Sequence, residues 1–486
     1  MKRQTLLVVI TLLVLGGISI AQIPTGNIER NPERRGIRRL KDDEIRRLSG
    51  PRTALESRKA GFPLDVRKSI FVTDVAILKS FTLEELMEKL VKDDASHSQT
   101  RESLFEQWWD TANPKTTFNL PFGGPNCDSG LLNNFPYKCP RDEGQQVLSG
   151  ALGTATPVAY TAIALSNRFD LATPPSKGGR DCGEYRIVFE RNSGAQNAFD
   201  RNLIIFEAVL PNPSPSQNSL HGCRKIQDFW EKLSNPGFSV ATRATLLHDF
   251  YYKGLPGYEP VVKATHYGSA TSKATGQIRT NQFMAGSGNH GPWLLREFHI
   301  QFVGQGSKKV EKIIPVPVAT NPPASLFDET DQNPLGTAFR AAIIGQVNSL
   351  ADGDINKISM ETAIADDDGE SEEGGLGAPP PAMDYSAAFA KSPNFANVIK
   401  QKLGASALTP VDIVSRAQTQ SCAGCHHLST GKNLGGNLTW PTTLGFTHEQ
   451  LANPENGPDG LRYQISPALT DVFLPFRKHV METFLH

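Results

Sequence analysis

The sequence is poor in cysteine, methionine and net charge. It has six cysteines and six methionines in 486 residues, and 50 basic residues balance 50 acidic ones. So few cysteines exclude a disulfide-dense scaffold, and the charge balance provides no overall field that would attract nucleic acid or anionic lipid. We therefore predict no nucleic-acid partner. The remaining composition, 38% hydrophobic with 42 Gly and 34 Pro, is typical of a globular protein with many loops.

Common enzyme signatures are also missing. The sequence contains no G-x-S-x-G, P-loop, H-E-x-x-H or dinucleotide fingerprint. No hydrolase, zinc-protease or nucleotide-binding reading is favoured, and the sequence leaves open whether the protein is an enzyme.

One hydrophobic run stands at the N-terminus, over Leu6 to Ile20, and it follows the basic residues Lys2 and Arg3. Small residues precede Gln22, so we predict a signal peptide over 1–21 that is cleaved before Gln22. The run is short for a hydrocarbon core about 30 Å thick, which disfavours an uncleaved anchor. No later run is long enough to span a membrane. We expect a bacterial protein that is periplasmic or secreted, without stable membrane insertion after cleavage.

The rest of the chain predicts an α+β protein in four parts. Residues 22–65 form a basic arm, 66–360 a β-rich domain with flanking helices, 361–392 an acidic Gly/Pro linker, and 393–486 a small all-α domain. Strands are predicted where β-branched and aromatic residues gather, over 70–78, 185–189, 203–210, 277–283 and 293–300. Helices are predicted after Thr82, around Trp108, over 226–233, over 335–350 and over 473–485.

Polar residues interrupt the apolar strands of the predicted β-rich domain. They are Asn167, Arg168, Asp170, Glu184, Arg186, Glu207, Arg279, Gln282, Arg296 and Glu297. Their charges suit a cleft, a solvated strand face or Arg–carboxylate pairs in the core. We favour the solvated face and the pairs over the cleft.

The motif C-x-x-C-H occurs once, as Cys422-Ala-Gly-Cys425-His426. Two thiols three positions apart can add to the two vinyl groups of one haem, and the next histidine can ligate its iron. Random placement predicts roughly 0.002 such matches in this composition. A zinc site would require a second ligand pair and a thioredoxin-like site a preceding βαβ unit, so both are disfavoured.

The segment 395–486 resembles a monohaem cytochrome c domain, because a predicted helix over 411–419 leads into the motif and the predicted helix over 473–485 follows it. The resemblance implies one covalent haem c, with thioether bonds to Cys422 and Cys425 and His426 as the proximal iron ligand. It covers under a fifth of the chain. The stretches 167–189 and 203–210 also resemble uncharacterised secreted bacterial proteins that end in C-x-x-C-H, which implies no activity.

The distal iron ligand is left open. Small cytochromes c usually present a methionine before the last helix, yet none lies between 427 and 480. The candidates are His448, in a loop, and Met481, for which core packing is favoured. His427, His479 and His486 are weaker candidates, and a vacant sixth site also fits.

Four cysteines lie outside the motif: Cys127, Cys139, Cys182 and Cys223. In an oxidising compartment an even number indicates two disulfides, with three possible pairings. Proximity in sequence favours Cys127–Cys139 and Cys182–Cys223.

The sequence therefore predicts an exported protein that binds haem covalently and transfers single electrons to an unknown redox partner protein. One alternative is a periplasmic oxidoreductase whose large domain acts on a substrate and passes electrons to the haem. Another is an envelope or surface binding protein with a structural haem.

Overall fold

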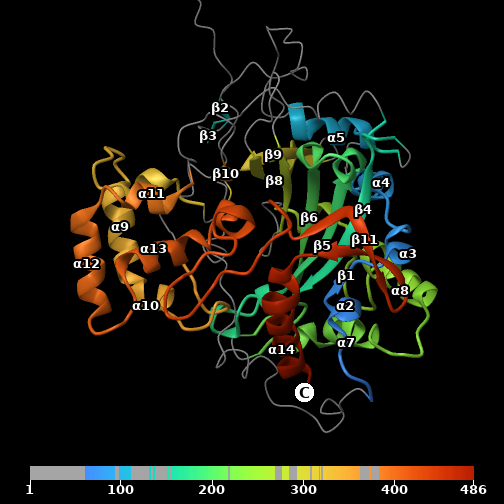
Figure 1. Ribbon diagram of the computed structural model, residues 1–486. Helices are drawn as coiled ribbons and strands as arrows, with labels where there is room; N and C mark the ends of the chain where they lie inside the picture. Colours follow the sequence, from blue (N-terminus) through green and yellow to red (C-terminus); the bar gives the residue numbers. More distant parts are fainter. Residues whose placement is uncertain are drawn as a thin grey trace, which may run out of the picture. The chain divides into compact units, whose positions relative to one another are not determined.

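An antiparallel β-sheet organises the fold in the computed structural model (Figure 1). The structure describes residues 61–93, 98–110, 131–132, 135–136, 150–153, 156–216, 219–268, 276–283, 293–306, 309–316, 318, 321–361, 371–373 and 383–486. The predicted signal peptide, nearly all of the basic arm, Cys127 and Cys139 lie outside these residues, as does most of the acidic stretch of the predicted linker. In the described part of the chain, no helix is long and apolar enough to cross a bilayer.

Eight described strands form the sheet in the order β1-β4-β5-β6-β7-β8-β10, and β9 also pairs with β8. Their bounds are β1 Phe71–Val72, β4 Tyr160–Arg168, β5 Asp181–Arg191, β6 Asn202–Pro211, β7 Gln277–Phe283, β8 Trp293–Val303, β9 Val310–Val316 and β10 Ser371–Glu373. The predicted strands over 185–189, 203–210, 277–283 and 293–300 are thus confirmed. A small described hairpin joins β2 (Leu131–Leu132) to β3 (Phe135–Pro136).

The run 70–78 was predicted as one strand, which is wrong beyond Val72. Helix α3 (Val75–Leu78) begins after Asp74, which holds its N-cap position in an extended conformation. A short continuous apolar run fits a buried strand and a buried helix equally well, so its periodicity does not separate the two.

One face of the sheet is apolar and covered by helices. These are α4 (Leu83–Val91), α5 (Arg101–Asp110), α7 (Arg224–Lys232) and α8 (Val240–Tyr252). Trp108 of α5 packs edge-on against Phe206, with ring centroids 5.6 Å apart, and Trp230 of α7 stacks on Tyr185. Successive strand residues point to opposite faces, so the alternate residues of β5 and β6 face away from these helices.

Thr82 caps α4 as predicted, because its hydroxyl accepts the backbone N–H of Glu85 at 3.1 Å. The Glu85 carboxylate pairs with His248 Nε2 at 3.1 Å. Helix α2 (Val66–Ser69) precedes β1.

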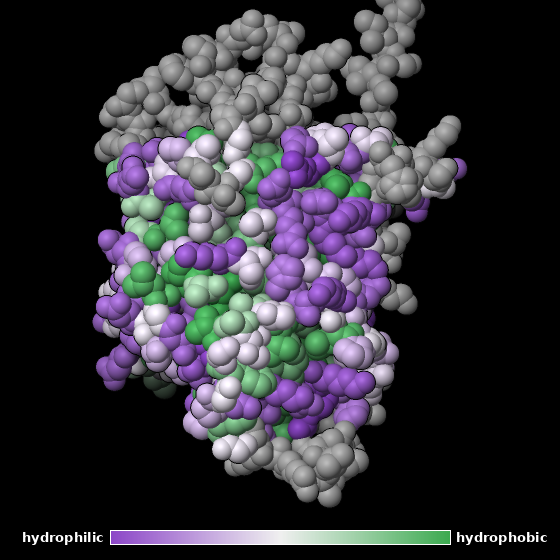
Figure 2. Space-filling model, turned by 90° about the vertical axis from the view of Figure 1, so that its right-hand side faces the viewer, coloured by the Kyte–Doolittle hydropathy of each residue, from purple (hydrophilic) through white to green (hydrophobic). Residues whose placement is uncertain are grey.

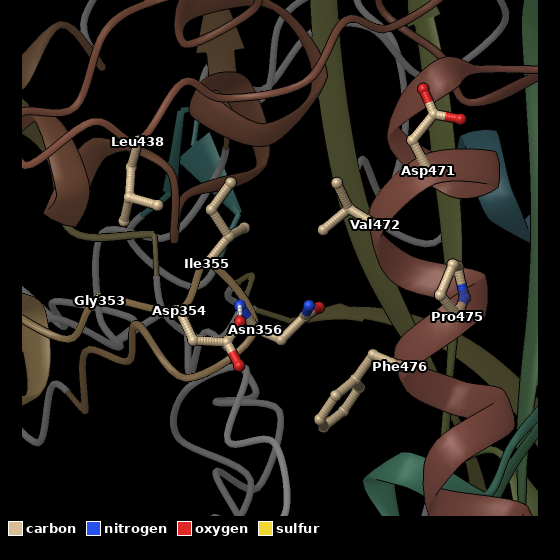
Figure 3. A pocket seen from close by; sticks show the side chains of 9 residues that line it. All are labelled: Gly353, Asp354, Ile355, Asn356, Leu438, Asp471, Val472, Pro475 and Phe476. Atoms are coloured by element: carbon tan, nitrogen blue, oxygen red, sulfur yellow. Dashed lines mark hydrogen bonds between the residues drawn. The ribbon is translucent and has the colours of Figure 1, made fainter.

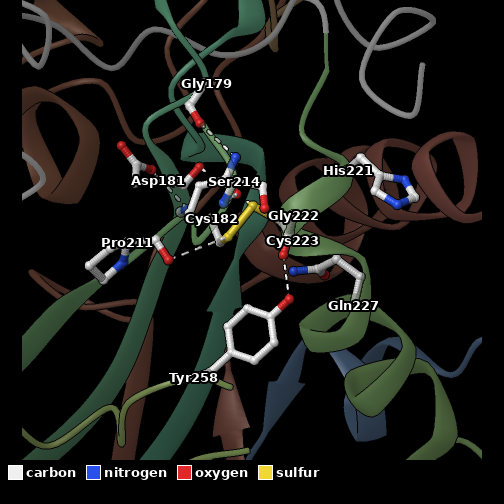
Figure 4. Close-up of a disulfide and its surroundings, with 12 residues drawn as sticks. Gly179, Asp181, Cys182, Pro211, Ser214, His221, Gly222, Cys223, Gln227 and Tyr258 are labelled. Atoms are coloured by element: carbon white, nitrogen blue, oxygen red, sulfur yellow. Dashed lines mark hydrogen bonds between the residues drawn. A yellow bond between two sulfur atoms is a disulfide. The ribbon is translucent and has the colours of Figure 1, made fainter. Parts of the chain in front are cut away.

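The predicted disulfide between Cys182 and Cys223 is confirmed (Figure 4). It joins the start of β5 to the turn η7 (His221–Cys223), which leads into α7. Tyr258 donates from its hydroxyl to the Gly222 carbonyl beside it.

Residues 383–486, the C-terminal segment, continue the fold. They contain helices α11 (Tyr385–Phe389), α12 (Pro393–Leu403), α13 (Pro410–Gln418) and α14 (Leu474–Leu485), the π-helical turns η11 (Gly424–Leu428) and η12 (Ala468–Phe473), and the hairpin of β11 (Glu449–Gly457) and β12 (Gly460–Ile465). The α+β class is confirmed, but an all-α C-terminal part is not, because this hairpin lies within it.

Two helices from the predicted β-rich range pack beside the C-terminal segment. Helices α9 (Gly336–Gly345) and α10 (Val347–Leu350) form a cluster with α11, α12 and α13 (Figure 1). The buried Arg416 of α13 joins them, since its guanidinium donates to the carbonyls of Leu350 and Asp352 at 3.1 and 2.8 Å. The described residues form one compact unit.

Hydrophobic and hydrophilic residues share the surface in separate patches on the face shown in Figure 2. The most exposed large apolar side chains in the described residues come from five separate elements: Phe199, Val303, Val398, Val411 and Leu461. Their distribution identifies no single apolar docking surface.

Candidate functional site

The C-x-x-C-H motif lies where α13 ends and the π-helical turn η11 begins. Cys422 and Cys425 are thiols in the structure, and both are partly exposed. Gly424 is required between them, because a Cβ at this position would lie 1.7 Å from the Gln418 carbonyl oxygen. The small residues of the motif therefore let the turn close tightly and present both thiols.

Asn321 orients the first thiol of the motif. Its Oδ1 accepts the Cys422 backbone N–H at 2.7 Å, and its Nδ2 lies 3.3 Å from Cys422 Sγ. Burial raises the pKa of Cys422, and the nearby Arg279 opposes that rise. The thiol is therefore protonated at neutral pH.

His426 carries its proton on one defined nitrogen. Its Nδ1 lies 3.1 Å from the carbonyl oxygen of Phe446, and because a carbonyl only accepts, Nδ1 is the donor. Burial lowers the pKa of His426 to about 4, so the ring is neutral at pH 7. A neutral ring protonated on Nδ1 has its lone pair on Nε2, which is the state required of a metal ligand.

His448, a predicted distal candidate, lies beside His426 with ring centroids 4.8 Å apart. Its Nδ1 lies 2.9 Å from Ser466 Oγ and its Nε2 lies 3.5 Å from Cys425 Sγ. His448 therefore neighbours both His426 and the second thiol of the motif.

The other distal candidates lie elsewhere. Met481 is 1% exposed in α14, and its sulfur accepts a contact from Asn167 Nδ2 at 3.9 Å, so it packs in the core as favoured. His427 stacks on Phe446 at a centroid distance of 4.0 Å. His486 pairs with Glu231 at 2.9 Å, and His479 is exposed.

The second face of the sheet carries a charged ladder, which we define as Arg168, Glu184, Arg186, Glu207, Arg279 and Glu297. Arg186 contacts Glu184 and Glu207 at 2.6 and 3.0 Å. Arg279 contacts Glu207 and Glu297 at 3.4 and 2.9 Å. The side chains of both arginines are 20% exposed, whereas the three carboxylates are at most 6% exposed. The expectation of paired Arg–carboxylate contacts is confirmed for Arg186 and Arg279 in this set, and Arg168 pairs with Asp170 at 2.9 Å.

The motif packs on this charged face. Arg279 and Asn281 share one face of β7, and the cross-strand pairs Arg279–Glu297 and Phe283–Trp293 place Glu297 and Trp293 on it as well. Trp293 lies 5.7 Å from the His426 ring between centroids, and Asn281 Nδ2 donates to the Phe446 carbonyl at 2.9 Å. Both contacts link the sheet to the loop beside the motif.

Sequence reasoning identified Cys422, Cys425, His426 and His448, and the structure brings these four together. It missed Asn281, Trp293 and Asn321, which contact the motif or its loop from other parts of the chain. No local pattern distinguishes these three from ordinary strand or loop residues.

A separate surface depression of about 420 Å³ lies between Asp354 and Asn356 on one side and Val472 and Phe476 on the other (Figure 3). None of the motif residues lines it. Among the described residues, no three His, Cys, Asp or Glu side chains gather to hold a metal ion by themselves.

Comparisons with protein-family models, with curated proteins and with solved structures find no match for this chain.

Proposed function

We propose that the protein is an exported c-type haem protein that transfers single electrons. The observation that carries the proposal is the donor set: two neighbouring thiols, followed by a neutral imidazole whose Nδ1–H is bonded to the Phe446 carbonyl at 3.1 Å. Cys422 and Cys425 would hold the haem and His426 would ligate its iron. The bound group supplies reversible one-electron redox chemistry. A redox partner protein would exchange electrons with it outside the cytoplasm.

The residues around the motif suit this group. Gly424 and Ala423 keep the turn small, and the Trp293 ring lies beside His426, with centroids 5.7 Å apart. Hydrogen bonding and polarity around an iron site set its redox potential. The chain thus provides both the thiols to which the haem would be attached and a defined environment around the histidine that would ligate its iron.

The test is covalent haem attachment to the full chain, made in bacteria that have haem-attachment machinery. Thioether-linked haem survives denaturation, so a denaturing gel of the wild type should stain for haem and its mass should include one porphyrin. Cys422→Ala is expected to lose most of this stain. The double variant Cys182→Ala/Cys223→Ala removes two other cysteines and should keep it. A wild-type chain without porphyrin mass would contradict the proposal.

A second candidate is an oxidoreductase whose large domain supplies substrate to the haem. It is favoured by one observation: the motif packs on the charged face of the sheet, where Arg186 and Arg279 are partly exposed. Such an enzyme requires a compound that reduces or oxidises the haem in wild type. Arg279→Gln should slow that reaction without removing the covalent haem.

A further inference from the structure

The loop whose carbonyl accepts the hydrogen bond from His426 has an unusual backbone conformation. Phe446 has φ of 62° and follows Gly445 at φ of 70°. A side chain with a Cβ rarely adopts the left-handed region, and a bulky aromatic residue there costs free energy. Such a conformation persists only where surrounding contacts impose it.

Contacts from the sheet impose it here. Asn281 Nδ2 donates to the Phe446 carbonyl at 2.9 Å, and Arg201 Nη1 donates to the Gly445 carbonyl at 2.7 Å. The Phe446 ring packs against Phe283 and Trp293, with centroid distances of 5.1 and 5.6 Å. Both carbonyls of the strained turn are therefore held by side chains from the sheet or its adjoining loops.

Asn281 is itself fixed. Trp293 Nε1 donates to Asn281 Oδ1 at 2.7 Å, and Asn281 is 2% exposed. An indole N–H only donates and a backbone carbonyl only accepts, so the residue between them must accept on one atom and donate on the other. A carboxamide does both, and aspartate or leucine of similar size does not.

The geometry points to Asn281 as the residue that positions His426. A continuous chain of hydrogen bonds runs from Trp293 through Asn281 to the Phe446 carbonyl, which also accepts from His426 Nδ1. By holding that carbonyl in place, the sheet keeps the His426 proton on Nδ1 and the lone pair on Nε2. Asn281 acts on His426 through the Phe446 carbonyl, so it is a positioning residue. The role in iron ligation rests on the proposed function, whereas the tautomer control does not.

The first experiment needs no haem. In the full chain made without haem attachment, nitrogen NMR of ¹⁵N-histidine reports which ring nitrogen of His426 is protonated, with His426→Gln identifying the signal. At pH 7 the wild type should show Nδ1–H alone. In Asn281→Leu the Phe446 turn is expected to relax, and the Nε2–H form, which free imidazole side chains prefer in water, should appear.

The matched control is Gln282→Leu. Gln282 is the next residue of β7, is fully buried, and accepts from Asn202 Nδ2 at 2.7 Å on the opposite face. The Gln282→Leu variant therefore loses an equivalent buried amide on the face of the sheet opposite the Phe446 turn. Its His426 signal should match that of the wild type. An unchanged signal in Asn281→Leu, or an equal change in both variants, would overturn the inference.

The second experiment uses the haem-loaded chain. A weaker bond from Nδ1–H makes imidazole a poorer electron donor to iron, so Asn281→Leu should raise the midpoint potential and Gln282→Leu should not. A potential that falls or stays constant in Asn281→Leu would overturn the positioning role. Absence of haem from the wild type would instead contradict the proposed function, while the NMR result would still decide the tautomer control.

Discussion

At the scale of single residues, Glu190 shows how burial alters the chemistry of a side chain next to the C-terminal segment. It is fully buried, its Oε2 accepts the Leu451 backbone N–H at 2.6 Å, and its Oε1 lies 3.5 Å from Arg201 Nε. Desolvation is the dominant effect and raises its pKa to about 7, while Arg201 and the Leu451 N–H oppose it. The carboxyl is therefore easier to protonate in the folded protein than in the unfolded chain.

This shift makes stability depend on pH. Because the carboxyl pKa is raised on folding, the folded state binds more protons than the unfolded state between about pH 4.5 and pH 7. The contribution of protonated Glu190 to the free energy of unfolding is therefore complete at low pH and is lost as the pH rises through 7. We predict that Glu190→Gln removes this loss. The free energy of unfolding of the variant, relative to wild type, should rise by roughly 3 kcal/mol between pH 4.5 and pH 8.

Denaturant unfolding at a series of pH values checks this prediction. Glu88→Gln is the control, since Glu88 of α4 pairs with Lys92 at 3.5 Å and both side chains are more than half exposed. Its difference from wild type should stay nearly constant. A Glu190→Gln difference that is also independent of pH would show that Glu190 does not titrate in this range.

At the scale of secondary structure elements, the charged ladder ties three strands together. Glu207 of β6 lies opposite Arg186 of β5 and Gln277 of β7, and it contacts both Arg186 and Arg279. Removing a buried carboxylate from between two guanidiniums lowers the stability of the fold, because each arginine then loses a partner in a poorly solvated place.

We predict that Glu207→Gln lowers the free energy of unfolding by about 3–5 kcal/mol. Chemical denaturation monitored by circular dichroism measures this. Glu84→Gln offers a surface comparison, because its partner Arg101 is more than a third exposed, and it should lower the free energy of unfolding far less than Glu207→Gln does. Equal costs for the two variants would mean that the ladder is solvated rather than buried.

Strands β5 to β8 of the ladder were predictable, because β-branched and aromatic residues gather in them between Gly, Pro and Asn clusters. Strand β4, which bears Arg168, was not among the predicted strands. The hairpin of β11 and β12 was not predictable. Its residues 453–459 are polar and rich in turn formers, so its pairing reflects contacts made elsewhere, such as the Glu190–Leu451 bond. Local propensity gives little indication of a strand under those conditions.

The candidate site was predictable only within its own motif. The C-x-x-C-H spacing along the chain is sufficient to identify Cys422, Cys425 and His426. Asn281 reaches Phe446 across 165 positions, and Asn321 reaches Cys422 across 101. Contacts at such separations depend on the packed fold, and a single sequence contains no pattern for them.

At the scale of the whole molecule, the question is whether the C-terminal segment folds with the sheet or as a tethered module. The acidic stretch over 361–392 predicts a tether. The described contacts favour common folding: Asn281 and Trp293 of the sheet hold the loop beside the motif, and Arg477 of α14 lies 3.8 Å from Asp170. Buried side chains that cross between parts of a chain couple their unfolding.

Arg416 provides a test of this coupling, because it lies in α13 and is 1% exposed. Its guanidinium donates to four carbonyls, those of Leu350, Asp352, Leu434 and Gly435. Arg416→Met leaves these acceptors without their donor, and we expect a loss of roughly 3 kcal/mol or more. If the molecule unfolds as one unit, amides in β5 and β6 should exchange with solvent faster by the same factor as amides in α12 and α13.

Hydrogen exchange under native conditions measures both regions in one experiment. Lys400→Met removes a cation from an exposed position of α12 and should leave both rates unchanged. Acceleration confined to α12 and α13 in Arg416→Met would show that the C-terminal segment opens independently of the sheet. A shared factor would mean that the central strands of the sheet and the helices that flank the motif open together, so that the loop holding His426 keeps its geometry as long as the sheet stays folded.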